Sequence, residues 1–170
     1  NGFDRTGQIS PDARELTGRI MVGRIIKTEA CVAEGAEWLA VQDERFRQAL
    51  DVTGPLPTRL RKDGFEQLLS AIVSQQVSVA AARAIWKRMR DAKLTGPRKV
   101  IWATEEELRA VGLSRQKVRY AKALAEARID FKGLRAAPND DIVKTLTEVS
   151  GIGVWTAEIY AMFSLGRADV

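Results

Sequence analysis

The chain has 170 residues, of which 45% are hydrophobic and 29% are charged, a composition that suits one soluble domain or two small lobes. It contains no histidine and a single cysteine, Cys31, which excludes an internal disulfide, a metal cluster held by its own cysteines and any imidazole mechanism. The apolar runs are too short to cross a bilayer and no signal-peptide pattern is visible, so we expect a cytoplasmic protein without membrane contact.

Positive charge is concentrated in the middle of the sequence. Residues 61–135 carry 17 Lys and Arg against 8 Asp and Glu, a net charge of +9, whereas the segments before and after are near neutral or acidic. Such a distribution favours one face built for a polyanion. The alternative is a set of solvated helix surfaces, which most charge runs are.

The first third of the chain predicts a tail and two helices. Residues 1–20 are polar and weakly patterned, and we interpret them as an expression tail or an extended reading frame. Residues 21–60 form the N-terminal part of a first lobe, with a helix capped by Thr28 and a second helix from Glu44 to Leu50. Gly54 and the prolines that follow it break the chain and mark the lobe boundary.

Residues 61–137 predict a basic helical lobe. Asp63 is the expected N-cap of a helix whose apolar stripe repeats at i, i+3, i+4, i+7 and i+8. Ser78 and Ser114 are expected to cap two further helices, over residues 79–92 and 115–127. Between them, Thr104 opens a short helix with capping-box spacing. No strand alternation occurs, so the fold class is all-α.

The segment 138–170 contains two glycines, Gly151 and Gly153, between two apolar helical patterns. A glycine turn that leads into a helix exposes backbone N–H groups and the positive end of the helix dipole, which together bind anions. On a basic protein the anion would be a nucleic-acid phosphate. The alternative interpretation is an ordinary turn between two helices with a glycine cap.

Three motifs in this order resemble the helix-hairpin-helix (HhH-GPD) DNA glycosylases over roughly residues 22–170. They are the helix and turn Phe65–Ser78, the turn Gly112–Lys117 and the hairpin Val149–Ala157. The resemblance is to the alkylpurine (3-methyladenine DNA glycosylase II) type. It implies a multi-helix, two-lobe fold, a monomer, and base-excision repair of duplex DNA that contains damaged bases, without a cofactor.

Trp155 carries the assignment to this type. Family members that also cleave the strand place a nucleophilic lysine at this position, and an indole cannot replace it, so the resemblance implies a monofunctional enzyme. The indole would stack on the flipped base, and the alternative is that Trp155 is a core anchor of the last helix. The single cysteine also argues against the iron–sulfur branch.

The resemblance assigns roles to further residues. Gln76, with Gln75 and Val77 as rivals, would be the wedge that fills the gap left by the extruded nucleotide; the alternative is that the two glutamines satisfy a helix end. The carbonyls of Val149 and Ile152 would share a monovalent cation. Groups expected to bind DNA phosphates are Ser150, Gly151, Gly153, Thr156, Arg115 and Lys117.

The family's catalytic aspartate is expected just beyond Val170, together with the helices that close the first lobe. It would stabilise positive charge on the sugar or activate water. The sequence therefore predicts a C-terminally truncated enzyme, in which Asp169 is an unlikely substitute, and an exposed apolar patch near Trp38, Phe46 and Leu50. A non-catalytic DNA-binding module and a helical interaction domain are the alternative functions.

Overall fold

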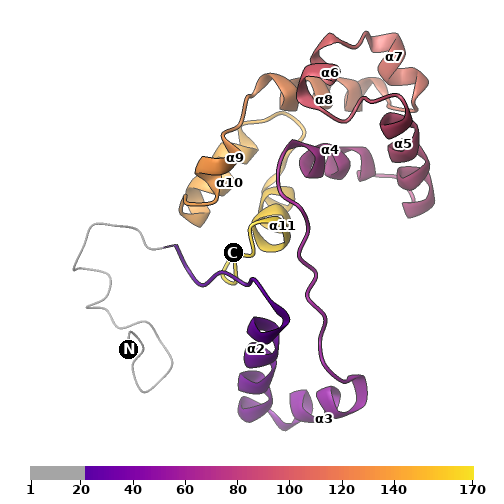
Figure 1. Cartoon of the computed structure of the whole chain (residues 1–170). Coiled ribbons are helices and arrows are strands. Elements are labelled where there is room, and N and C mark those ends of the chain that lie inside the picture. Colours follow the sequence, from indigo (N-terminus) through magenta and orange to yellow (C-terminus); the bar gives the residue numbers. More distant parts are fainter. Residues whose placement is uncertain (1–21) are drawn as a thin grey trace.

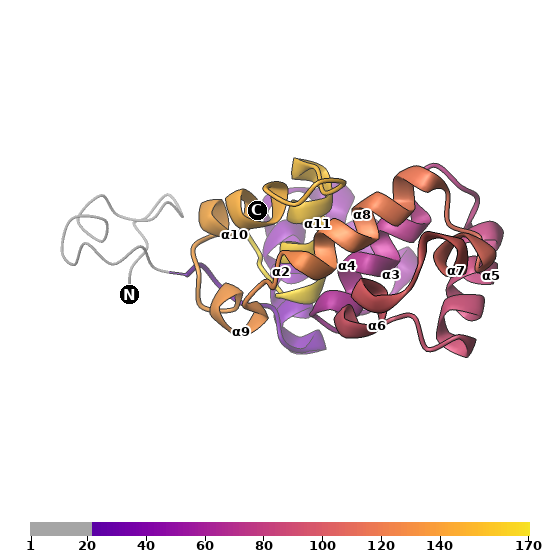
Figure 2. The same cartoon turned by 90° about the horizontal axis from the view of Figure 1, so that it is seen from above.

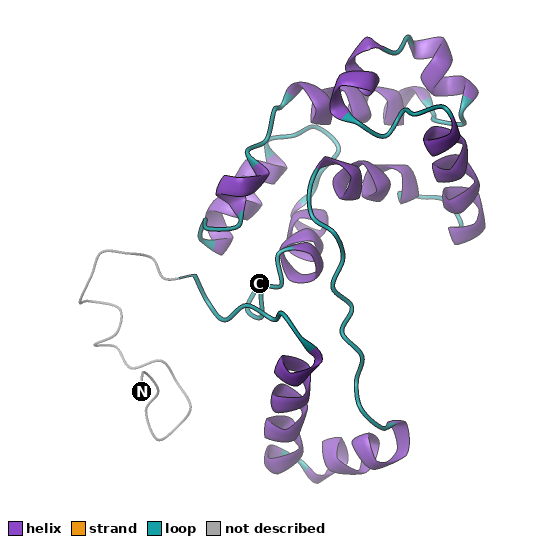
Figure 3. Ribbon diagram, in the orientation of Figure 1, coloured by secondary structure: helices purple, strands orange, loops and turns teal. Residues whose placement is uncertain are grey.

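The computed structural model describes residues 22–170, so the expected tail at 1–20 lies outside the described residues. Within residues 22–170 the chain forms ten helices joined by loops and no strand, which confirms the all-α prediction (Figure 3). None of these helices has both the length and the apolar character needed to cross a membrane.

Helices α2 (Glu29–Gln42) and α3 (Glu44–Thr53) pack against each other and stand apart from the other helices (Figure 1). Ala40 is the one buried residue of the pair, and Trp38 is 59% exposed. The expected apolar surface is therefore present at Trp38 and Phe46, whereas Leu50 is half-buried. The pair is tethered through flanking backbone, where Ile26 N–H donates to the Gly166 carbonyl at 2.7 Å and Arg61 N–H donates to that of Phe163 at 2.7 Å.

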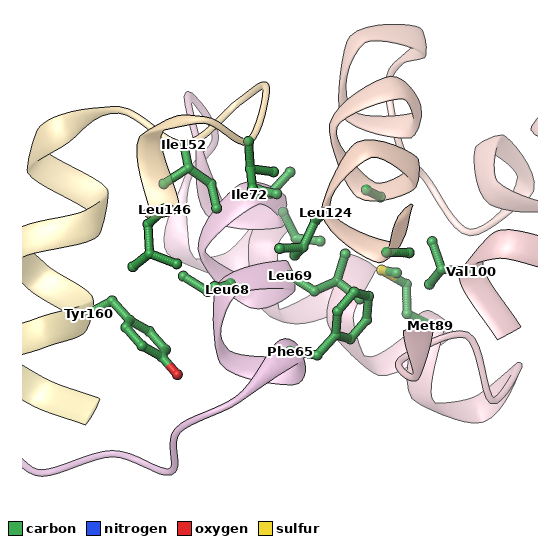
Figure 4. Close-up of a cluster of buried hydrophobic side chains, with 14 of the residues drawn as sticks. Phe65, Leu68, Leu69, Ile72, Met89, Val100, Leu124, Leu146, Ile152 and Tyr160 are labelled. Carbon is green, nitrogen blue, oxygen red and sulfur yellow. The ribbon is translucent and has the colours of Figure 1, made fainter. Parts of the chain in front are cut away.

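Helix α4 (Phe65–Ser74) is the centre of the hydrophobic core. It packs against α5 (Val79–Asp91), α8 (Arg115–Glu126) and α11 (Val154–Ser164), so apolar side chains are needed on most of its circumference. Figure 4 shows its side chains reaching both Leu124 on one side and Leu146 on the other. The fully buried residues of this helix are Leu68, Leu69, Ile72 and Val73.

Short helices complete the described chain, and Figure 2 shows them along an elongated body. Ser78 and Ser114 accept hydrogen bonds from backbone N–H groups at 3.2 Å, and Thr104 forms the complete capping box, so these three predicted caps are confirmed. Two helices were not predicted, because one begins at a proline and the other has only four residues, too few to show a period. The short helices are α6 (Pro97–Trp102), α7 (Glu105–Ala110), α9 (Phe131–Leu134) and α10 (Asn139–Thr147).

The predicted cap at Asp63 is wrong, and the predicted cap at Thr28 is confirmed in position only. The N-cap of α4 is Gly64, because the carboxylate of Asp63 is held instead by the Arg135 guanidinium at 2.6 and 3.0 Å. The two-pronged pair joins two opposite charges and engages both carboxylate oxygens, whereas a cap hydrogen bond would engage the carboxylate with an uncharged backbone N–H. Thr28 occupies the N-cap position of α2, but its side chain makes no cap hydrogen bond and lies 3.6 Å from the Cys31 sulfur.

The Tyr160 hydroxyl joins α11 to the start of α4, since it accepts the Gly64 N–H at 2.7 Å. Tyr160→Phe should lower the free energy of unfolding by about 1–2 kcal/mol, because it leaves this N–H without its partner. Tyr120→Phe is the matched control: it removes only an exposed hydrogen bond from Gln116 and should change stability by less than about 0.5 kcal/mol. Urea titration measures the free energy of unfolding of both variants. Equal losses would contradict the role given to the hydrogen bond between Tyr160 and Gly64.

The same side chain predicts a pH dependence. Burial raises the pKa of Tyr160 to about 12, above the ordinary value of about 10, so the unfolded chain loses this proton first. The stability of the wild type relative to Tyr160→Phe should therefore be constant below about pH 10 and shrink as the pH rises towards about 12. Urea titrations of both proteins across this range test the sign, and a growing difference would refute it.

Candidate functional site

Three turns that are far apart in the sequence meet around one groove of about 620 Å³. They are the α4–α5 turn, the α7–α8 turn and the α10–α11 turn, which correspond to the three motifs of the sequence. Tertiary packing brings them together because α4 contacts α5, α8 and α11. The residues that line the groove include Gln75, Gln76, Gly112, Ser114, Gln116, Lys117, Tyr120, Gly151, Ile152 and Gly153.

The two glycines of the hairpin differ in conformation and surroundings. Gly151 has a φ of 94°, and a Cβ added there would lie 2.6 Å from Cδ2 of Tyr120, so only glycine fits. Gly153 has a φ of −91°, which any residue adopts, and a Cβ added there would meet no atom within 4 Å. Packing within the described chain therefore explains why residue 151 is a glycine, but it does not explain why residue 153 is one.

The N-terminus of α11 points unsatisfied donors away from the protein. Gly153 is the N-cap and no side chain caps this end. The first bond of the helix ladder runs from Ala157 N–H to the Gly153 carbonyl at 3.0 Å, and the described residues supply no acceptor for the N–H groups of Val154, Trp155 and Thr156. Ser150 is exposed in the same turn. Free N–H groups at the positive end of a helix can hold an anion.

The two glutamines of the α4–α5 turn have different environments. Gln75 is half-buried, and its Nε2 donates to the carbonyl of Gly151 at 2.8 Å. Gln76 is exposed and has a φ of 53°, a left-handed conformation that costs a non-glycine residue about 1–3 kcal/mol. The exposed tip of the turn is therefore strained at Gln76.

The basic residues of the α7–α8 turn are divided between two environments. Lys117 lines the groove, but its Nζ donates to the carbonyl of Val73 at 2.6 Å, and partial burial lowers its pKa. Arg115 is exposed, lies 3.8 Å from the Glu105 carboxylate and does not line the groove. The hydrogen bond of Lys117 to the end of α4 links residues 44 apart, and no local pattern could have predicted it.

A second pocket, of about 240 Å³, lies between α4 and α11. Trp155 lines it and is 71% exposed, so Trp155 is not a core anchor. Thr156 lines this pocket rather than the groove, and Gln75 lines both. The other lining residues include Gln67, Leu68, Ser70, Ala71, Ser74, Ile159 and Tyr160.

Arg61 supplies the charge at this pocket, and no carboxylate of the described chain lines it. Its guanidinium lies over the Phe163 ring, 5.5 Å from the centroid. Sequence reasoning missed this contact because the loop before α4 meets α11 only in the fold. Asp169 lies elsewhere, in a hollow with Lys144 and Glu158, where its backbone carbonyl accepts a hydrogen bond from the Asn139 side chain.

The turn of the hairpin offers carbonyl oxygens to a cation. The carbonyl of Val149 accepts the Ile152 N–H at 3.0 Å and retains a second lone pair. Neutral carbonyls without a carboxylate fit a monovalent ion better than Mg²⁺ or Ca²⁺, whose sites normally include carboxylates. No cluster of acidic, cysteine or histidine residues within 22–170 could hold a metal ion. The cation between Val149 and Ile152 stays a prediction.

Comparison with known proteins identifies relatives of this architecture. DNA-3-methyladenine glycosylase 1 of Schizosaccharomyces pombe is 32% identical over 140 residues, which are 75% of this chain and 61% of that protein. The crystal structure of a DNA-3-methyladenine glycosidase from Bacillus halodurans superposes with a TM-score of 0.68 at 36% identity, covering 77% of this chain and 64% of that one. The structure of the S. pombe 3-methyladenine DNA glycosylase Mag1 in complex with abasic DNA superposes with a TM-score of 0.68 at 30% identity. The superposition covers 81% of this chain and 72% of that one.

The chain thus spans about three fifths of the length of the first two relatives. The sequence model of the HhH-GPD superfamily base excision DNA repair proteins matches residues 69–167, which run from α4 to the segment after α11. The matched region contains all three turns of the groove and most of the pocket beside Trp155. The chain belongs to the HhH-GPD superfamily of base excision DNA repair proteins.

Proposed function

We propose that this protein is a monofunctional DNA glycosylase that removes alkylated purines from duplex DNA. The observation that carries the proposal is the junction of an anion-binding hairpin with a neighbouring pocket whose rim bears an exposed indole. A DNA phosphate would rest on the free N–H groups of α11, and the extruded base would enter the pocket beside Trp155. Relatives named 3-methyladenine glycosylases support the choice of alkylated purines.

The reaction is a hydrolysis. The oxygen of water bonds to C1′ of the sugar and the water loses one proton to the solvent. The C1′–N bond breaks and its electron pair leaves with the base, which is thereby neutralised if alkylation had made it cationic. Trp155 offers no amine to form a covalent intermediate, so water is the nucleophile. Its π face would stack on the flipped base, and the strained tip at Gln76 would occupy the vacated position in the duplex.

The catalytic carboxylate belongs to the proposal as well. No carboxylate of the described residues lines the pocket, and Asp169 lies in a different hollow. With no carboxylate of the described chain at this pocket, the 170-residue chain should bind DNA but release no methylated purine, and turnover by this chain would show that one of its own carboxylates performs this role.

The first test compares abasic with intact duplex DNA. A base-flipping protein should bind the abasic duplex more tightly by about tenfold, because no base must be unpaired and unstacked. Fluorescence anisotropy of the 170-residue chain at two salt concentrations measures this ratio. Equal affinities would favour a non-catalytic DNA-binding module, and no binding at low salt would favour an interaction domain without a nucleic-acid role.

Base release tests the chemistry. The protein as expressed from its gene should release 3-methyladenine or 7-methylguanine from methylated duplex without cutting the strand. Chromatography of the released bases and a denaturing gel of the DNA separate the two events. Strand cleavage would contradict the monofunctional assignment, and a folded protein that releases no base would contradict the proposed activity.

The two glycines of the hairpin provide a matched pair of variants. Gly153→Ala should change the free energy of unfolding by less than about 1 kcal/mol but weaken binding to both duplexes, because the new methyl group points to where the phosphate would lie. Gly151→Ala should destabilise the fold by about 3 kcal/mol through its positive φ and the clash with Tyr120. Urea titration and DNA binding test both variants, and unchanged binding by a folded Gly153→Ala protein would refute the phosphate site.

A further inference from the structure

The amide of Gln75 connects the groove to the pocket. Gln75 is the C-cap of α4, lines both cavities, and donates its Nε2–H to the carbonyl of Gly151 at 2.8 Å. Residues 75 and 151 are 76 positions apart, and this hydrogen bond links the α4–α5 turn to the glycine hairpin. Because its amide is engaged and half-buried, Gln75 differs from its exposed neighbour Gln76.

The hydrogen bond fixes the orientation of one peptide unit of the hairpin. The Gly151–Ile152 peptide is planar, so its carbonyl and its N–H move together. Gln75 holds the carbonyl, and the carbonyl of Val149 accepts the N–H of Ile152 at 3.0 Å. This unit immediately precedes Gly153 and therefore sets the direction from which the free N–H groups of α11 meet a ligand.

The same hydrogen bond constrains the strained tip. Gln75 has extended backbone with a ψ of 133°, and the next residue, Gln76, has the left-handed φ of 53°. An exposed side chain does not by itself hold its backbone in such a conformation, so the surroundings must impose it. The anchored side chain of Gln75 is one such restraint, directly next to the strained residue.

We propose that Gln75 is a positioning residue that couples phosphate capture by the hairpin to insertion of Gln76 and opening of the base pocket. This inference rests on the proposed function. A wedge must enter the duplex at a fixed distance from the phosphate that the hairpin holds. Gln75 sets that distance by linking the wedge turn to the phosphate turn, without itself entering the duplex.

Gln75→Leu tests the link, since leucine has a side chain of similar size that cannot donate to the Gly151 carbonyl. Gln48→Leu is the matched control, because it makes the same exchange on α3, where Gln48 is exposed and lines neither the groove nor the pocket. Anisotropy with abasic and intact duplexes gives the preference of each protein, and the salt dependence of binding to intact duplex reports the phosphate contacts. Urea titration verifies that both variants fold.

We expect Gln75→Leu to lower the preference for abasic over intact duplex by about tenfold, the equivalent of a hydrogen bond of about 1.4 kcal/mol. Its affinity for intact duplex should fall by a smaller factor than its affinity for abasic duplex, and Gln48→Leu should keep the wild-type preference. In the double variant with Gly153→Ala, the two effects on abasic binding should be less than additive.

The outcomes separate the two proposals. A wild-type protein without abasic preference overturns the proposed function, whatever the variants do. If the wild type discriminates and Gln75→Leu does so equally well, the coupling role is wrong. If Gln75→Leu weakens both duplexes by the same factor, or if its effect simply adds to that of Gly153→Ala, the hydrogen bond only supports the hairpin and the coupling role is again wrong.

Discussion

The hydrogen bond from the Lys117 ammonium to the carbonyl of Val73 closes the C-terminal end of the central helix. Helix α4 is packed between α5, α8 and α11, and the last carbonyls of any helix lack partners within the helix. Lys117 supplies one of these partners with a charged donor, which also complements the negative end of the helix dipole. The buried helix can therefore end directly at the groove, and the residues that follow, Gln75 and Gln76, are delivered to the site.

Other basic side chains have the same role. Lys122 donates to the carbonyls of Ile101 and Ala103 at the C-terminal end of α6, and Arg88 donates to that of Val111 at the end of α7 at 2.9 Å. Arg167 is buried and donates to carbonyls around the end of α9, and its burial lowers its pKa. Short helices have many terminal carbonyls for their length, so part of the positive charge in the middle of the sequence serves the fold. The number of basic residues therefore overstates how much positive charge is free to bind a polyanion.

Local features of the fold could be predicted from the sequence, whereas contacts between distant segments could not. The caps at Ser78, Thr104 and Ser114 depend on residues three positions away, and all three are present. The prediction for Asp63 failed because its partner, Arg135, is 72 positions away and is a better ligand than a backbone N–H. Local signals give the elements, but tertiary partners decide what each polar side chain binds.

The candidate site also combines local features that the sequence reveals with contacts between distant segments that it does not reveal. Its three turns are visible in the sequence because glycine, serine and glutamine mark them, but the groove exists only where α4, α8 and α11 meet. Arg61 and its contact with Phe163 carry no sequence signal, since neither residue belongs to a recognisable motif. The exposure of Trp155 also required the structure, because a tryptophan in an apolar helix is more often buried.

Gly151 and Gly153 are the same residue type two positions apart, and the structure gives them different physical reasons. The ring of Tyr120 and a φ of 94° exclude any side chain at position 151. At position 153 the backbone is ordinary and the space beyond the α-carbon is open, so no contact of the described chain requires glycine there. A second molecule that approaches the backbone would require it, because a Cβ would stand between that molecule and the free N–H groups of α11. The glycine that the fold does not need is therefore the position at which a substitution tests the proposed phosphate site most directly.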